Sequence, residues 1–433
     1  MCRFFVTVTI LLSAVPMGRG QDAVRLIELF SPDYQYRVSC RVTVEGTLKL
    51  PPAKDQSAQT LKITGKSAID YHERVFSATN GKVEKTVRKV QQMDFTRNVG
   101  GQDQESKLRG EVSLLVIQRL QNLEVPFSPQ GPLTLGEIEL VRTDVFTPAL
   151  VGLLPKAPVR QGETWVADID AVKELTDLET IDKGRLTCRY EGVEAGNQRL
   201  ARVSFQGAIR GVGEDGQAEH QLDGYYLFDL QSHNISYVSL EGKQLPLDKN
   251  GVPQGEIKGT FVLTRDPDSK IADLDNAALA RWNLTPNDDN TQLLFDGVTI
   301  RFLYPRQWRV DEANDRQIRL AERQGSELLI TLDPVTRLPE MTNFYKEVLN
   351  GLQGQKAQLV NIAKPRALQT TPYPIEHFGV EARFGAQPAS FDYYIIRQNR
   401  GGATLSARYP PAQADARRRD VERIIQSAVL NVK

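Results

Sequence analysis

Alternation of apolar and polar residues dominates the first part of the chain. Residues 34–45 read YQYRVSCRVTVE, in which one parity is aromatic or apolar: Tyr34, Tyr36, Val38, Cys40, Val42 and Val44. A period of two is typical of a β-strand with one buried face. Residues 185–190, RLTCRY, repeat the pattern and place Cys188 on the buried parity. Both stretches therefore predict half-buried strands.

More strand-like runs follow, and Gly, Asn, Asp and Pro separate them: 61–69, 85–97, 111–119, 199–209, 220–230, 234–242 and 255–264. Helical periodicity is scarce before residue 270. We therefore expect a mainly antiparallel β domain over residues 21–265. A division into two sub-sheets, joined near the Pro- and Gly-containing segment 126–162, stays open.

One stretch raises the question of a dinucleotide. Residues 209–217, IRGVGEDGQ, contain G-x-G-x-x-G after a strand-like run. That fingerprint needs its glycines to open a helix whose N-terminus holds the pyrophosphate. Here a second strand pattern follows, and Asp215-Gly216 is a hairpin-turn signal. We interpret the segment as a turn and expect no cofactor.

The pattern changes after the last of these strands. In residues 266–292, Ile271, Leu274, Ala278 and Trp282 fit one stripe of a short helix, and TPNDDNT reads as a polar linker. Residues 293–433 then predict a separate α+β domain with an antiparallel sheet flanked by helices.

The C-terminal domain is predicted to contain strands at 297–303, 307–311, 316–321, 326–332, 357–362, 375–384, 391–398 and 402–408. A helix around 339–352 and a final helix after Pro410-Pro411 complete it. The final helix is expected to bury Val421, Ile424, Ile425, Ala428 and Val429. Its run Arg417-Arg418-Arg419 is expected on the solvent face.

The N-terminus has the layout of a signal peptide over residues 1–20. Arg3 precedes an apolar run from Phe4 to Met17, and small residues lead to cleavage near Gly20. A retained N-terminal anchor is the alternative. No other segment is long and apolar enough to span a bilayer. We expect the mature chain to be exported, to the periplasm or outside the cell, with no membrane span.

Cleavage removes Cys2 and leaves two cysteines, Cys40 and Cys188. An oxidising compartment permits a disulfide between them, provided that their strands are neighbours. The sequence leaves open whether they are bonded or are two buried thiols.

Composition and motifs argue against several functions. Among 433 residues, Lys+Arg and Asp+Glu are equal at 54 each, whereas nucleic-acid binding favours a basic excess. His72-Glu73 begins like a zinc-peptidase motif, but Phe76 stands where the second histidine belongs. C-x-x-C, G-x-S-x-G and Walker motifs are absent from the sequence. We predict no catalytic residue, no metal site and no cofactor. Tyr225, Tyr226 and Phe228 alternate between faces, which leaves part of this group exposed for binding.

The C-terminal domain resembles the PsbP-like superfamily over roughly residues 295–431. The resemblance is carried by Phe302-x-x-Pro305-x-x-Trp308, the ladder of short strands, the mid-domain helix and the closing helix. Gln307 departs from the glycine that the family often has there. The superfamily supplies non-catalytic binding or assembly modules, which implies a protein partner. The N-terminal half is similar to uncharacterised exported bacterial β-rich proteins through LLPKAPVRQGETW (Leu153 to Trp165) and LDGYYLFDLQSHNI (Leu222 to Ile235).

These observations predict an exported, non-enzymatic binding or assembly protein of the cell envelope. Two alternatives stay open. Curved antiparallel sheets also hold lipid in LolA-like carriers, so the N-terminal domain could carry an apolar ligand. A glycan hydrolase whose two carboxylates lie far apart in sequence is the third reading.

Overall fold

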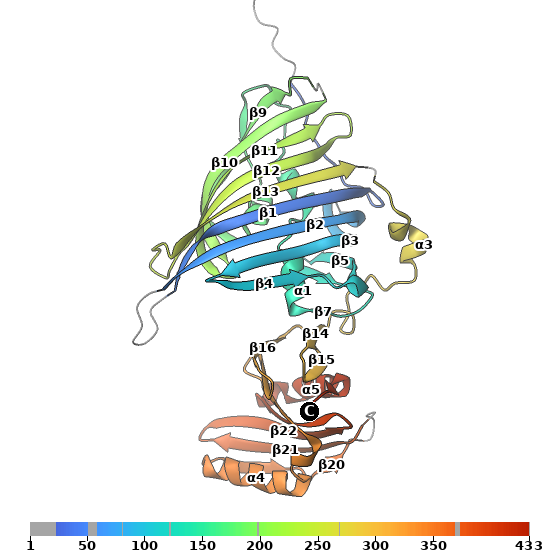
Figure 1. The fold of residues 1–433 in the computed structure, drawn as a ribbon, viewed down its shortest axis with the longest axis vertical. Coiled ribbons are helices and arrows are strands. Elements are labelled where there is room, and N and C mark those ends of the chain that lie inside the picture. The colour runs from blue at the N-terminus through green and yellow to red at the C-terminus, as the bar shows by residue number, and fades with distance from the viewer. Residues whose placement is uncertain are drawn as a thin grey trace, which may run out of the picture.

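The computed structural model describes residues 23–50, 59–79, 81–120, 123–196, 199–267, 269–368 and 373–432. The signal peptide predicted for residues 1–20 lies outside the described residues. The chain is mainly β, with several antiparallel sheets. Figure 1 shows the large sheet at one end of the long axis, with a smaller sheet and helices α4 and α5 at the other.

The large sheet has twelve strands in the order β6-β5-β3-β2-β1-β13-β12-β11-β10-β9-β8, and β4 pairs with β3 outside this path. Its strands are β1 (Gln35–Leu50), β2 (Gln59–Thr79), β3 (Lys82–Val99), β4 (Gln102–Lys107), β5 (Leu114–Leu120), β6 (Leu123–Phe127), β8 (Thr164–Val166), β9 (Leu178–Val193), β10 (Leu200–Gly213), β11 (Gly216–Asp229), β12 (Asn234–Pro246) and β13 (Gly255–Pro267). A division into two sub-sheets is wrong, because β1 pairs with both β2 and β13 and makes one continuous sheet.

The alternation in β1 sets which face of the sheet is buried. Tyr36, Val38 and Cys40 have at most 1% of their surface exposed, while the residues between them reach solvent. Residues directly opposite each other in antiparallel strands share a face. Cys40 is opposite Leu263, which is opposite Val238, and both partners are buried. We call this buried side the inner face and the opposite side the outer face.

The glycine motif at 211–216 lies in a hairpin, as predicted. β10 ends and β11 begins with Gly213 paired to Gly216, which leaves Glu214 and Asp215 as the loop. Gly216 has a φ of +112°, a conformation that side chains disfavour.

A cover segment that the sequence did not predict packs on the inner face. It comprises β7 (Leu133–Thr134), α1 (Leu135–Arg142), the 3₁₀ helix η2 (Thr147–Leu153) and α2 (Ile169–Thr176). α1 begins with a capping box in which Thr134 and Glu137 exchange side-chain and backbone hydrogen bonds. Leu140, Leu150 and Leu153 are buried in the same core cluster as the strands. The segment 126–162 therefore covers one sheet instead of linking two.

The connection between the sheets is less helical than the sequence suggested. The stripe at 271–282 forms two short elements, η3 (Ala272–Leu274) and α3 (Asn276–Leu279), not one helix. Leu274 and Leu279 are buried against strand residues that include Val87 and Phe127. A short 3₁₀ turn, η1 (Gly110–Val112), precedes β5.

The C-terminal part contains an eight-stranded sheet in the order β16-β17-β18-β23-β22-β21-β19, with β20 paired to β21. Its elements are β16 (Trp308–Ala313), β17 (Gln317–Glu322), β18 (Glu327–Asp333), η4 (Val335–Arg337), α4 (Met341–Gly354), β19 (Gln358–Ile362), β20 (Arg366–Ala367), β21 (Ile375–Phe384), β22 (Gln387–Gln398), β23 (Gly401–Tyr409), η5 (Pro411–Gln413) and α5 (Ala414–Ser427). Along β22, Tyr393 and Ile395 pack in the cluster of α4, while Tyr394 and Ile396 pack in the core that includes α5. The two helices therefore cover opposite faces.

A four-stranded sheet joins the two parts. Its order is β24-β15-β14-β7, with β14 (Leu293–Asp296), β15 (Ile300–Tyr304) and β24 (Val429–Leu430) from the C-terminal part. β7 comes from the cover segment and pairs in parallel with β14.

Two details of the last helix differ from prediction. Val429 is 60% exposed, because the chain leaves the helix before it and pairs as β24. Neither Arg417 nor Arg418 points freely into solvent, because each side chain bonds a carboxylate. Arg417 bonds Glu322 at 3.3 Å, and the Nε of Arg418 donates at 2.8 Å to Asp392, whose side chain is 1% exposed.

Candidate functional site

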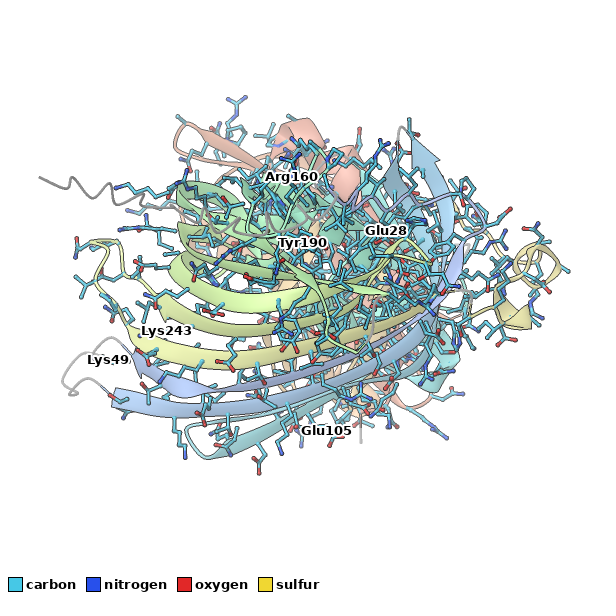
Figure 2. All side chains as sticks on the ribbon, turned by 90° about the horizontal axis from the view of Figure 1, so that it is seen from above. Glu28, Lys49, Glu105, Arg160, Tyr190 and Lys243 are labelled. Atoms are coloured by element: carbon cyan, nitrogen blue, oxygen red, sulfur yellow. The ribbon has the colours of Figure 1, made fainter. Side chains whose placement is uncertain are left out.

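Within the described residues, a hollow of about 1060 Å³ lies on the outer face of the large sheet. Six strands contribute to it, in the order β1, β13, β12, β11, β10 and β9. In Figure 2, Lys243 of the hollow lies toward the outer margin of the curved strands, whereas Glu28 and Tyr190 lie nearer the middle of the view. We call this pocket the outer hollow.

Strand register arranges the side chains of the outer hollow in two straight rows. The first row carries polar and acidic groups and runs Thr187, Gln206, Asp223, Glu241, Thr260, Thr43. The second carries all three cations of the lining and runs Arg185, Ala208, Gln221, Lys243, Lys258, Glu45. Each residue is directly opposite the next in its row, so each row crosses all six strands.

Close packing of the strands depends on glycine between the rows. Gly207 points to the inner face, and a Cβ atom there would come 2.2 Å from the carbonyl oxygen of Arg185. Because real Cβ atoms do not approach backbone oxygen so closely, a side chain at this position would force the strands apart. Glycine at position 207 therefore allows β9 and β10 to pack closely beneath the outer hollow.

The charges of the outer hollow balance. Its lining includes three cations, Arg185, Lys243 and Lys258, and three carboxylates, Glu45, Asp223 and Glu241. Two of the cations, Lys243 and Lys258, form salt bridges with Glu256, a residue outside the lining. The Nζ atoms of Lys243 and Lys258 lie 2.6 and 3.3 Å from Glu256, and the hydrogen bond from Lys243 is the main cause that lowers the pKa of Glu256.

An aromatic pair adjoins the outer hollow. Tyr225 lies two residues beyond Asp223 on the same face, and its ring centroid is 5.7 Å from that of Tyr237. The guanidinium of Arg202 lies 3.5 Å from the centroid of the Tyr225 ring. Tyr226 points to the inner face and is buried, as is Phe228. The predicted alternation of faces in this group is confirmed.

A second cluster of charges lies on the inner face, sealed from solvent. The guanidinium of Arg88 bonds Glu73 at 2.7 Å and Asp144 at 2.9 Å, and all three side chains are at most 2% exposed. The hydroxyls of Tyr36 and Thr147 both contact Glu73 and lie 3.0 Å from each other. Because Asp144 and Thr147 belong to the cover segment, this inner ion cluster ties the cover to the sheet.

Two carboxylates share one cation in the inner ion cluster, and their pKa values move apart. Burial raises the pKa of Asp144 to about 7, against the opposing effect of Arg88. Burial acts in the same direction on Glu73, but Arg88 and the hydrogen bond from Tyr36 offset it and leave its pKa below the usual range. No ligand can reach these groups without displacing the cover, so we assign the cluster a structural role.

The two cysteines do not meet. Cys40 on β1 and Cys188 on β9 are buried free thiols, and β13, β12, β11 and β10 lie between their strands. Strands in a sheet are about 4.8 Å apart, whereas a disulfide needs Cα atoms within about 7 Å. A disulfide between Cys40 and Cys188 would require their strands to be neighbours, and they are not. Burial raises the pKa of Cys188 to about 12 and that of Cys40 well above its usual value.

The motif His72-Glu73 lies in strand β2, not on the helix that a zinc-peptidase motif needs. Glu73 enters the inner ion cluster, while His72 bonds Ser269 at 3.1 Å. Within the described part of the chain, no three His, Cys, Asp or Glu side chains gather in a group that could hold a metal ion.

Sequence reasoning did not identify the residues of the outer hollow. Their outward parity was readable in each strand. Which outward residues stand in line, however, depends on the register between strands, and the pattern of one strand does not contain it. A cofactor is not implied by any of these groups.

No family model matches the chain, and no curated protein matches it. Among solved structures, the Ran-binding protein Mog1p from Saccharomyces cerevisiae is 13% identical, and the match covers 34% of this chain and 97% of that chain at a TM-score of 0.25. Cyanobacterial PsbP (CyanoP) from Synechocystis sp. PCC 6803 is 12% identical over 32% of this chain and 92% of that chain, at a TM-score of 0.26. DynF from the dynemicin biosynthesis pathway of Micromonospora chersina is 9% identical, and the match covers 60% of this chain and 92% of that chain at a TM-score of 0.15.

At these TM-scores the likeness to PsbP and Mog1p is a weak resemblance of fold over about a third of the chain. It says nothing about function. The expected similarity of the N-terminal half to exported bacterial proteins stays a prediction. No helix within the described ranges combines the length and apolar character that a membrane crossing requires.

Proposed function

We propose that the chain is an exported, non-enzymatic binding or assembly protein of the cell envelope, and that the outer hollow is its binding surface. The observation that carries the proposal is the pair of side-chain rows. They present hydroxyl, amide, carboxylate and cationic groups over a hollow of about 1060 Å³. Strands position such groups more rigidly than loops do. Export is supported by the layout of residues 1–20.

The partner must be polar and extended to use both rows. Lining side chains such as Asp223, Gln206 and Thr260 are exposed, so they offer hydrogen bonds without first being uncovered. The sequence favours a protein partner, through the PsbP-like resemblance of the C-terminal part. Envelope material therefore provides the first test, since it contains both proteins and polymers.

The experiment compares three versions of residues 21–433 as bait for envelope extract. The variant Asp223→Ala/Glu241→Ala removes two carboxylates from the outer hollow. The control Glu105→Ala removes an exposed carboxylate from β4, outside the hollow. We expect wild type and control to retain the same partner and the double variant to lose it. Equal retention by all three would refute the hollow as the binding surface.

The alternative of an apolar-ligand carrier has support at one place on the inner face. Val42, Val44, Ile257 and Phe261 are half-buried there, and Gly242 and Gly259 add no side chain. The remaining inner face is filled by the cover segment. Native mass spectrometry of freshly purified protein tests this reading: a co-purifying lipid supports it, and bare protein that takes up no fluorescent fatty acid rejects it.

The third reading, a glycan hydrolase, has one supporting contact. Asp223 and Glu241 are directly opposite in β11 and β12, and opposed Cβ atoms lie about 4.5–5.5 Å apart. Retaining glycosidases hold two carboxyl groups about 5–5.5 Å apart, a separation that the carboxylates of directly opposite residues can reach. Turnover of an oligosaccharide that the double variant abolishes would establish this reading and overturn the non-enzymatic proposal.

A further inference from the structure

The spacing of the rows restricts what the outer hollow can bind. Each row crosses β1, β13, β12, β11, β10 and β9 at about 4.8 Å per strand, so its length is about 24 Å. A ligand that follows the rows is therefore an extended polymer that lies across the strands. A sugar unit in an extended glycan is close in length to one strand spacing. An extended peptide advances by about 3.3 Å per residue and does not stay in step with the rows.

The chemistry of the rows suits hydroxyl-rich ligands. Thr187 can donate and accept, and Thr43 and Thr260, whose hydroxyls bond each other at 2.7 Å, keep one donor and further acceptor sites between them. Gln206 and Gln221 offer both an amide N–H and a carbonyl, and Asp223 and Glu241 accept. Sugar hydroxyls also donate and accept. Both partners can therefore satisfy their hydrogen bonds across an open, wet surface.

The charges of the outer hollow select against polyanions, because two of its three cations are already paired with Glu256. Three cations and three carboxylates line the outer hollow, and Lys243 and Lys258 are also neutralised by Glu256. A polyanion would gain little from these two paired lysines and would be repelled by Asp223 and Glu241. A neutral polymer avoids this conflict, since its hydroxyls bond to either sign.

Tyr225 and Tyr237 supply the apolar surface that the two polar rows lack. Both rings are half-buried at the edge of the hollow, with 5.7 Å between centroids. Arg202 covers one face of the Tyr225 ring, so the apolar surface left for the C–H face of a sugar lies mainly on Tyr237 and on the ring edges of the pair. The geometry points to a neutral glycan as the ligand of the outer hollow, lying across the strands with one flank on this tyrosine pair. This inference rests on the proposed function and specifies its ligand.

The test uses residues 21–433 and isothermal titration with neutral hexasaccharides: cellohexaose, chitohexaose, maltohexaose and mannohexaose. We expect at least one to bind. Its affinity should fall at least tenfold in Asp223→Ala/Glu241→Ala and at least threefold in Tyr237→Ala. The control Glu105→Ala should keep wild-type affinity, and circular dichroism verifies that each variant is folded. Gln206→Ala/Gln221→Ala, which removes two exposed amides, provides a second hollow variant and should weaken binding in the same way.

The inference fails if none of the four sugars binds, or if binding is unchanged in both hollow variants. It also fails if a net-neutral peptide of similar length binds as tightly as the best sugar. These failures are distinct from failure of the proposed function. Capture of an envelope partner that depends on Asp223 and Glu241, without sugar binding, would retain the binding surface and reject the glycan. Cleavage of a bound sugar would retain the glycan and reject the non-enzymatic assignment.

Discussion

Replacing Arg88 by methionine tests whether the inner ion cluster holds the cover segment on the sheet. Arg88 is at most 2% exposed and bonds Glu73 at 2.7 Å and Asp144 at 2.9 Å. Methionine fills much of the same volume but leaves two carboxylates facing each other without a cation. Breaking a buried pair by removing one partner costs about 3–5 kcal/mol. For a unit of this size we expect a melting temperature lower by about 10 °C.

Thermal unfolding followed by circular dichroism at pH 8 measures the effect. The control Arg97→Met removes an exposed arginine from the same strand, and surface changes stay within about 0.5 kcal/mol. The triple variant Glu73→Gln/Arg88→Met/Asp144→Asn removes every charge and should regain part of the lost stability. If Arg88→Met melts within about 2 °C of Arg97→Met, or if the triple variant is less stable than Arg88→Met, the cluster does not act as we describe.

Further predictions concern pH, thiols and the last helix. The pKa of Asp144 is raised from 3.8 to about 7, so its contribution stabilises the fold at low pH and is lost as pH rises from about 4 through 7. The free energy of unfolding should fall by up to about 4 kcal/mol more across that window in wild type than in Asp144→Asn; parallel denaturant-derived profiles would contradict this. Cys40 and Cys188 should resist maleimide at pH 8 until the chain is unfolded, and a reduction-sensitive shift in electrophoretic mobility would contradict the free thiols. Arg418→Ala should destabilise the fold by about 1.5–3 kcal/mol, because it removes the arginine that donates to the buried carboxylate of Asp392. Replacing its exposed neighbour, Arg419→Ala, should change stability little. Equal melting curves for the two variants would refute the distinction.

The strands were predictable because each carries its own pattern. Along β1, Tyr36, Val38 and Cys40 alternate with polar residues, and the structure confirms both the strand and its buried face. The hairpin at Gly213 and Gly216 was predictable for the same reason, since turn chemistry is local. These features depend on neighbours in sequence.

The features that were missed depend on partners far away. The sequence left open a division into two sub-sheets, and the pairing of β1 with β13 makes them one sheet. No local pattern specifies the partner of a strand. α1 is eight residues long, too short for a clear helical period, although Thr134-x-x-Glu137 was a readable capping signal. The outer hollow needed the register of six strands at once. Arg418 looked solvent-exposed because sequence does not show the buried Asp392 beside its helix.

The union of β1 with β13 has a consequence for how the polypeptide folds. Partners such as Cys40 and Leu263 are separated by more than two hundred positions, so the middle of the sheet is completed by some of its most distant contacts. Closing such long loops delays native pairing and slows folding. During synthesis, the edge of β1 that pairs with β13 stays uncovered until residue 267 has been added, and uncovered edges invite association between molecules. We expect this protein to refold slowly and to depend on chaperones while it does so.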